Sequence, residues 1–227
     1  MTAMTPLCLF ERLKAACGDD WAAYTRHEFV RSLGDGNLAP AAFRYYLRQD
    51  YLFLIHFARA YGLAAFKADN LADLRRAAGA LSHIAENEMA LHVGFCAGWG
   101  IDEAQMAATP EDPANMAYTR YVLERGLAGD ALDLAVALAP CIVGYAEIGV
   151  WLTAPGGPAT GGNPYQAWID TYAAQDYQDV ARAHIDYLDQ LMARRGGPGR
   201  FEGLAKTFGE ATRLEIGFWR MGLDAAR

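Results

Sequence analysis

Apolar residues recur at helical spacing along almost the whole chain of 227 residues. Steps of three, four and seven residues separate the large apolar side chains, which puts them on one face of a helix. Two of the clearest sets are Phe43, Tyr46, Leu47, Phe53, Leu54, Phe57 and Tyr61, and Leu134, Leu138, Tyr145, Ile148 and Leu152. Alanine and leucine abound while β-branched residues are few, which favours helices over strands. The sequence therefore predicts an all-α fold.

Helix-breaking segments divide this pattern. Glycine, proline and asparagine mark boundaries at 34–37, 98–101, 109–113 and 195–199. The predicted helices cover 6–17, 20–33, 40–67, 71–98, 114–127, 130–153, 164–173, 175–194 and 198–224. The stretch 154–164, with sequence APGGPATGGNP, lacks the Lys-Ser or Lys-Thr of a Walker loop and is interpreted as a flexible connection. Because no other segment resembles an interdomain linker, we expect a single domain over residues 1–227.

Composition and charge exclude several classes of protein. The chain is 53% hydrophobic and 12% aromatic, which is too apolar for a disordered protein. Its formal net charge is -7 and its basic residues cluster only in short pairs, so nucleic-acid binding is disfavoured. The most apolar stretch, 131–151, is interrupted by Asp133, Pro140 and Glu147 and does not predict a membrane-spanning helix. Residues 1–11 show no signal-peptide pattern, so we expect a cytoplasmic protein with no membrane partner.

Two acidic residues stand where the helical pattern predicts core. Asp50 lies seven residues from both Phe43 and Phe57, and Glu215 lies seven residues after Phe208. Seven residues are two helical turns, so both carboxylates should point inward. Burying an unpaired carboxylate costs several kcal/mol, so each must be paired, hydrogen-bonded or exposed to a polar pocket. For either residue alone a structural ion pair is the simpler interpretation, whereas a shared pocket explains both together.

A third carboxylate repeats the pattern. Glu88 lies between Ile84 and Leu91 on the same predicted face. A structural bond to nearby His83 or His92 is the favoured interpretation of Glu88. We therefore expect it to support a site rather than to react.

One cysteine stands out among four. Cys8, Cys17 and Cys96 have no CxxC or zinc-type spacing and are expected to be reduced thiols. Cys141 follows Pro140 on an apolar stripe, with Tyr145 one turn later. Spacing alone leaves two interpretations open: a small core thiol beside a proline, or a nucleophile activated by polar neighbours.

Metal and haem chemistry find little support in the sequence. A di-iron carboxylate site in a helical bundle needs Glu-x-x-His on two helices. Glu88 and His92 are four residues apart instead of three, and no second copy exists. A histidine such as His27 could serve as a haem ligand, although a lone histidine before an aromatic residue is more often structural. We expect no metal and no organic cofactor.

Five segments together resemble the TenA/thiaminase II family, in order and spacing over nearly the whole chain. They are HEFVRSLGDGNLAPAAFRYYLRQDYLFLIHFARA (27–60), ENEMALH (86–92), LAPCIVGYAEIG (138–149), NPYQAWIDTYA (163–173) and RLEIGFW (213–219). The segment with proline, cysteine and a tyrosine four residues later is the most specific. The resemblance implies a haem-oxygenase-like helical bundle, usually assembled as a homotetramer.

The resemblance also implies an activity and roles for individual residues. Members of the cysteine-bearing branch hydrolyse aminopyrimidines to hydroxymethylpyrimidine for thiamin salvage, and some also cleave thiamin. By motif, Cys141 resembles the nucleophile and Glu215 the acid that protonates the leaving amine. The residues that resemble contacts to the pyrimidine substrate are Asp50, Tyr118, Tyr145 and Tyr172.

The chain departs from the family at one position. The residue three places after Asp50 is often tyrosine in the family, with a hydroxyl thought to increase the nucleophilicity of the thiol, and is Phe53 here. Phe53 therefore puts the rate of the thiol-dependent reaction in question. It remains part of the expected substrate pocket. Tyr51 points about 160° away from Phe53 on a helix and is not expected to replace the hydroxyl.

Two other functions remain as alternatives. The first is a non-catalytic member of the family that acts as a pyrimidine-binding or regulatory protein, since the family name records an effect on transcription. The acidic composition and the lack of a basic recognition helix argue against direct DNA binding. The second is a haem or di-iron oxygenase on the same fold.

Overall fold

The computed structural model describes residues 7–158 and 162–227, and within these ranges every regular element is helical. The predicted all-α class is therefore confirmed. The chain divides into two compact units. The first contains the described residues of Met1–Asn37 and Ala135–Arg213, and the second contains Leu38–Leu134 and Leu214–Arg227. That the chain behaves as one domain stays a prediction.

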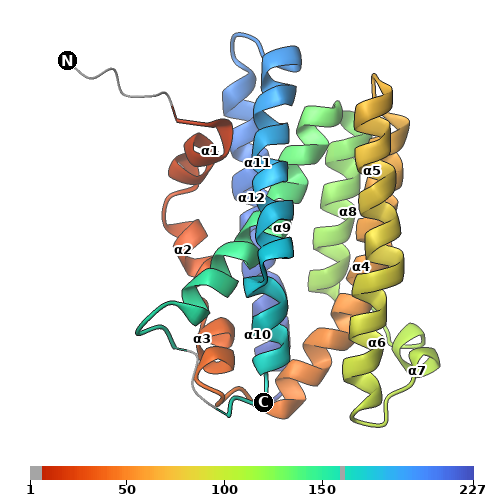
Figure 1. The fold of residues 1–227 in the computed structure, drawn as a ribbon, viewed down its shortest axis with the longest axis vertical. Helices are drawn as coiled ribbons and strands as arrows, with labels where there is room; N and C mark the ends of the chain where they lie inside the picture. The colour runs from red at the N-terminus through yellow and green to blue at the C-terminus, as the bar shows by residue number, and fades with distance from the viewer. Residues whose placement is uncertain (1–6, 159–161) are drawn as a thin grey trace. The chain divides into compact units, whose positions relative to one another are not determined.

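The first unit contains the N-terminal helices and most of the C-terminal half. Its elements are α1 (Leu9–Cys17), α2 (Asp19–Thr25), α3 (Glu28–Gly34), α9 (Ala131–Thr153) from Ala135 onward, α10 (Gln166–Ala173), α11 (Gln175–Arg195) and α12 (Arg200–Asp224) as far as Arg213. Helix α1 packs on α2 and α11, and α10 packs on α11 (Figure 1). Trp21 of α2 joins this core, with its ring stacked 5.4 Å from that of Phe208.

The second unit is organised around one long helix. Its elements are α4 (Pro40–Phe66), α5 (Leu71–His83), the π-helical turn η1 (Ile84–Glu88), α6 (Met89–Ala97), α7 (Glu103–Ala107), α8 (Pro113–Ala128) and the remaining ends of α9 and α12. Helices α5, α6, α7 and α8 and the turn η1 all pack on α4. Figure 1 shows α4 beside the α5–α6 column and α8. Residues from these elements supply the carboxylates and aromatic rings described below.

Helix α9 is the most apolar element. It is long and apolar enough to cross a membrane, yet 78% of its most apolar window is buried inside the protein. Burial on this scale is typical of a core helix. The interruptions at Asp133 and Glu147 lie within it, and Pro140 is inside the helix.

Two predicted helices differ from the structure in their detail. The predicted helix 20–33 is divided into α2 and α3, because the His27 side chain accepts a hydrogen bond from the Phe29 backbone N–H and caps a new helix. The predicted helix 71–98 is continuous along the chain, but its register widens to a π-turn at Ile84–Glu88. Such turns are frequent at functional sites.

One short helix was not predicted. Helix α7 begins with a capping box, in which the Asp102 side chain accepts from Gln105 N and the Gln105 side chain accepts from Asp102 N. That polar signal was present in the sequence, whereas the apolar period was too short to reveal five helical residues. Parts of two predictions fall outside the described residues: the helix start at residue 6, and residues 159–161 of the predicted connection.

Candidate active site

Asp50 lies inside the second unit, as the apolar pattern of α4 predicts. The residue is 5% exposed. The hydroxyl of Tyr46, one turn earlier on α4, donates a hydrogen bond to Asp50 Oδ2 at 3.2 Å. The imidazole Nε2 of His92, on α6, lies 2.6 Å from the same oxygen. The buried carboxylate is therefore paired, as its burial requires.

Glu88 lies one turn before His92, at the end of η1, and is half-buried. His92 Nδ1 donates to the backbone carbonyl of Glu88 at 2.8 Å. The expected bond to His92 therefore forms through the backbone of Glu88 instead of its carboxylate, and His83 is exposed. Burial raises the pKa of Glu88 to about 7; the His92 charge opposes this rise and the Asp50 charge adds to it.

Glu215 is the second inward carboxylate, and the structure gives it a tyrosine partner. It lies on α12 and is 1% exposed, which confirms its predicted burial. The hydroxyl of Tyr118, on α8, donates to Glu215 Oε1 at 2.9 Å. Tyr118 and Glu215 were both candidate site residues, but nothing in the sequence predicted that they touch. Hydrogen-bonding between residues 97 positions apart is fixed only by the packing of α8 and α12.

Phe53 packs directly against this tyrosine. Its ring centroid lies 5.2 Å from that of Tyr118 and 5.6 Å from that of Phe218. The hydroxyl of Tyr51 instead donates to Glu103 Oε1 at 3.1 Å, on α7. The prediction that Tyr51 points elsewhere is therefore confirmed, while Phe53 packs among aromatic rings.

Cys141 lies in the first unit, on α9, where its residue is half-buried. Tyr145, one turn later, packs its ring 4.8 Å from that of Tyr172 on α10. Trp168 extends this cluster, with its centroid 4.6 Å from that of Tyr172. The structure thus brings two of the predicted pocket tyrosines together, one from α9 and one from α10. Trp168 was not singled out from the sequence, although it lies one turn before Tyr172.

Two glycines of α9 allow neighbouring helices to approach closely. A Cβ at Gly149 would clash with the backbone of Tyr172 and Ala173, and a Cβ at Gly144 would clash with the ring of Tyr24. Tyr24 donates from its hydroxyl to the carbonyl of Pro140 at 3.1 Å. These close approaches bring α2 and α10 against the helix that carries Cys141.

Burial affects two of the other thiols. Burial raises the pKa of Cys96, with Arg48 opposing the rise. Burial also raises the pKa of Cys17, although a hydrogen bond with Thr212 opposes it. A raised thiol pKa reduces the fraction of reactive thiolate at neutral pH. Both are therefore poor candidates for the nucleophile.

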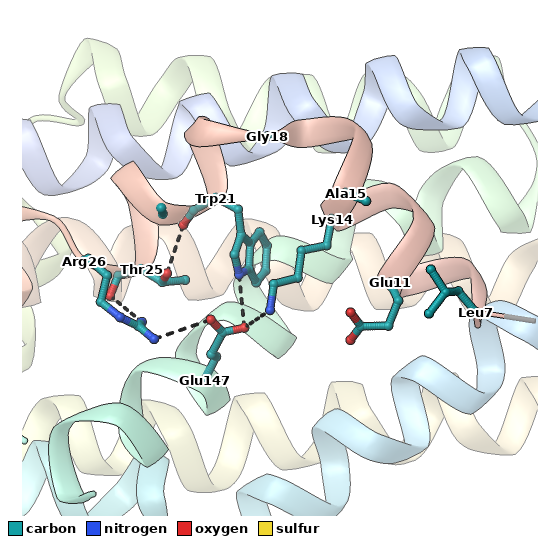
Figure 2. Close-up of a pocket in the computed structure, with 10 residues that line it drawn as sticks. Leu7, Glu11, Lys14, Ala15, Gly18, Trp21, Thr25, Arg26 and Glu147 are labelled. Atoms are coloured by element: carbon teal, nitrogen blue, oxygen red, sulfur yellow. Dashed lines mark hydrogen bonds and ion pairs between the residues drawn. The ribbon is translucent and has the colours of Figure 1, made fainter. Parts of the chain in front are cut away.

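A separate pocket in the first unit, of about 510 Å³, opens between α1, α2 and α9. Figure 2 shows Glu147 at its centre, accepting hydrogen bonds from Lys14 Nζ at 2.7 Å and Trp21 Nε1 at 3.0 Å. Arg26 completes an ion cluster at 3.6 Å from Glu147 Oε1. Cys141 does not line this pocket. The cluster ties α1 and α2 to α9. The Glu147 carboxylate neutralises one of the two cations, Lys14 and Arg26, so we assign the cluster a structural role.

The described part of the chain contains no group of three or more His, Cys, Asp or Glu side chains arranged to hold a metal ion. The His27 side chain, the candidate haem ligand, instead caps α3.

A family model describes the chain from residue 16 to residue 225, and its description is TENA/THI-4/PQQC family. The chain belongs to this family. The predicted TenA resemblance is therefore confirmed over nearly the whole sequence.

Two relatives match this chain over most of their length. A Haemophilus influenzae protein described as uncharacterized is 40% identical over 218 residues, covering 96% of this chain and all of the relative. The aminopyrimidine aminohydrolase of Halalkalibacterium halodurans is 34% identical over 206 residues, which are 90% of each chain.

A solved structure of the same family confirms the fold. A TenA family transcription regulator from Silicibacter sp. is 45% identical and superposes with a TM-score of 0.90, covering 95% of this chain and 96% of that chain. The helical fold is therefore the haem-oxygenase-like fold of TenA structures.

Proposed function

We propose that this protein hydrolyses aminopyrimidines in thiamin salvage. It converts 4-amino-5-aminomethyl-2-methylpyrimidine and water to 4-amino-5-hydroxymethyl-2-methylpyrimidine and ammonia. The observation that carries the proposal is the match, over 90% of both chains, to an aminopyrimidine aminohydrolase. The buried carboxylates and the tyrosine cluster beside the cysteine helix supply the residue types that this chemistry needs.

Cys141 is the nucleophile in this proposal. An electron-poor pyrimidine ring accepts a thiolate at a ring carbon, a step that neutral water performs poorly. The covalent adduct divides one difficult substitution into easier steps. Addition of sulfur to the ring supplies the electron pair that expels the amine from the exocyclic methylene.

Glu215 is the acid that protonates the departing amine, so that ammonia leaves. Water then adds to the exocyclic methylene and returns a proton to the Glu215 carboxylate. The C–S bond breaks, the ring regains its aromaticity, and Cys141 leaves as the thiolate. The Tyr118 hydroxyl, 2.9 Å from Glu215 Oε1, fixes the direction of the carboxyl group.

The substrate is held by a carboxylate and aromatic rings. Asp50 accepts hydrogen bonds from the amino group of the pyrimidine, while Tyr118, Tyr145 and Tyr172 contact the ring. Phe53 forms an apolar wall where relatives often carry a tyrosine. These steps require no metal and no organic cofactor.

The setting of the enzyme follows from the same family resemblance. We propose a cytoplasmic homotetramer whose partner is a small pyrimidine. Cleavage of thiamin itself is a second activity that the same thiol chemistry allows, because thiamin carries the same pyrimidine and methylene.

A regulatory function is the second candidate. The structurally matched Silicibacter protein, at 45% identity, is described as a transcription regulator. In this alternative the chain binds the pyrimidine without converting it.

Product analysis separates the two candidates. The purified protein is incubated with the aminomethylpyrimidine and, separately, with thiamin, and products are measured by mass spectrometry in water enriched in ¹⁸O. We expect repeated turnover to hydroxymethylpyrimidine with one ¹⁸O and stoichiometric ammonia. Ligand binding by calorimetry without product would instead support the regulatory candidate.

A further inference from the structure

Both ring nitrogens of His92 face hydrogen-bond acceptors. Nδ1 lies 2.8 Å from the backbone carbonyl of Glu88, and a carbonyl can only accept, so Nδ1 carries a proton. Nε2 lies 2.6 Å from Asp50 Oδ2. The residues His92 and Asp50 are each 5% exposed, so water contributes little to either.

This arrangement requires one proton more than a neutral imidazole beside a carboxylate. With Nδ1 protonated, a neutral ring would present a lone pair from Nε2 to a carboxylate oxygen, and the two would repel at 2.6 Å. A proton on Nε2 removes the repulsion and forms a charge-assisted hydrogen bond, which is short and strong. The geometry therefore favours an imidazolium paired with a carboxylate.

The hydrogen bonds to Asp50 all fall on one oxygen. Among the described residues, Tyr46 and His92 are the partners of the Asp50 side chain, and both bind Oδ2. Oδ1 is therefore the oxygen that remains for a ligand. Tyr46 lies on the same helix as Asp50 and His92 on α6, so two elements fix the orientation of the carboxylate.

We propose that His92 is the positioning residue of Asp50: its imidazolium holds Oδ2 and presents ionised Oδ1 to the amino group of the aminopyrimidine. This inference rests on the proposed function, because it takes Asp50 as the substrate contact. It gives the motif ENEMALH (86–92) a role at the site, with Glu88 contributing its backbone carbonyl.

The charged groups around His92 support this assignment. Burial lowers the pKa of His92, but the Asp50 charge, the hydrogen bonds to Asp50 and the Glu88 carbonyl, and the Glu88 charge together raise it above its ordinary value. The groups that face the imidazole are Asp50 from α4 and Glu88 from η1, and Tyr46 shares the same Asp50 oxygen.

The test is the kinetics of His92→Gln, which keeps a polar side chain but carries no charge. We expect the KM for the aminomethylpyrimidine to rise about tenfold or more, while kcat changes by less than about threefold. The matched control is His83→Gln, an exposed histidine nine residues earlier, for which we expect wild-type kinetics.

Two results would overturn the inference: an unchanged KM in folded His92→Gln, or an equal rise of the KM in His83→Gln. Circular dichroism establishes that the variant is folded. If it is not, nitrogen-15 NMR of the wild-type imidazole decides, with both His92 nitrogens expected to remain protonated above the pH of about 6.5 at which an ordinary histidine loses its proton. Asp50→Asn should return His92 to a neutral ring, and a neutral His92 in the wild type would contradict the proposal. Absence of wild-type turnover would reject the proposed function alone, since the NMR result does not depend on activity.

Discussion

At the scale of single residues, the two inward carboxylates of the second unit are held in different ways. Asp50 faces a charged imidazole and a tyrosine hydroxyl. Glu215 accepts a hydrogen bond from the hydroxyl of Tyr118, whose ring packs against that of Phe53. A carboxylate oriented by two partners on one oxygen suits substrate binding, whereas one bonded to a neutral hydroxyl suits proton donation. The difference in partners matches the two roles proposed.

The variant Glu215→Gln tests the acid. An amide cannot donate the proton that releases ammonia, so kcat for the aminomethylpyrimidine should fall about 100-fold or more, as for loss of a general acid. Thiamin would release a neutral thiazole, which needs no added proton, so any activity on thiamin should fall less. Equal losses on both substrates would argue that Glu215 acts in binding instead.

The raised pKa of Glu88 predicts a pH dependence of stability. A folded-state pKa of about 7, above the ordinary 4.5, means that stability is fully present at low pH and is lost as pH rises through about 7. Glu88→Gln cannot ionise, so between pH 5 and 8 it should gain stability relative to the wild type, by at most about 3 kcal/mol. Urea unfolding at several pH values measures this difference. Glu86→Gln, at an exposed neighbouring position, is the control, and an equal gain there would contradict the explanation.

The sequence predicted which residues face inward but not which residues meet. The two-turn spacing from phenylalanines was enough to predict that Asp50 and Glu215 are buried. The contact from Tyr118 to Glu215 and the contact from His92 to Asp50 join different helices. Helical periodicity describes one element at a time, so such pairs follow only from packing. Tyr46 was more accessible to prediction, because it stands one turn before Asp50 on the same helix.

At the scale of elements, α9, which carries Cys141, is the helix on which its neighbours in the first unit pack. Small residues at Gly144 and Gly149 let α2 and α10 approach its backbone. The Tyr145–Tyr172 contact at 4.8 Å depends on the approach of α10. On another face of α9, Glu147 binds Lys14 and Trp21 of the N-terminal helices, so several neighbours fix the direction of α9 (Figure 2).

Elements were predicted well where the apolar period is long and poorly where local polar groups decide. Helix α4 is found at Pro40–Phe66 against a predicted 40–67, and α9 at Ala131–Thr153 against 130–153. The break between α2 and α3 depends on a histidine side chain that accepts from a backbone N–H. A period count does not detect such a cap.

Gly149→Ala tests the close approach of α10. The added methyl would meet the backbone of Tyr172 and Ala173, and overpacking of this kind costs about 1–3 kcal/mol. We expect a lower midpoint of thermal unfolding and weaker binding of the pyrimidine. The matched control is Gly79→Ala on α5, where a Cβ meets nothing within 4 Å. There alanine should stabilise the helix by about 0.5–1 kcal/mol, and a loss of stability at both positions would argue against a specific contact at Gly149.

At the scale of the whole molecule, each compact unit is built from two separate stretches of the sequence. The first unit uses the N-terminal segment and residues after Ala135, while the second uses the middle of the chain and the C-terminal end. Helices α9 and α12 each pass from one unit to the other without interruption. Two units that share unbroken helices should lose their structure together.

Unfolding monitored in each unit separately tests the predicted single domain. The tryptophans of the first unit are Trp21, Trp151 and Trp168, and those of the second are Trp99 and Trp219. Variants that retain tryptophan in one unit only should give coincident denaturant midpoints, equal to that of far-ultraviolet circular dichroism. Separate midpoints would show that the units are independent domains.

Light scattering on the same samples should give about four times the chain mass of 24.8 kDa if the homotetramer forms.

The central claim is that a cysteine of α9 hydrolyses an aminopyrimidine, and the measurement that tests it most directly is turnover by Cys141→Ser. The variant and the wild type are given the aminomethylpyrimidine and thiamin together, and all products are quantified by mass spectrometry. Cys17→Ser, at another half-buried thiol, is the matched control. We predict that Cys141→Ser loses hydrolysis almost completely while Cys17→Ser retains it. Hydrolysis at the wild-type rate by Cys141→Ser would contradict the account.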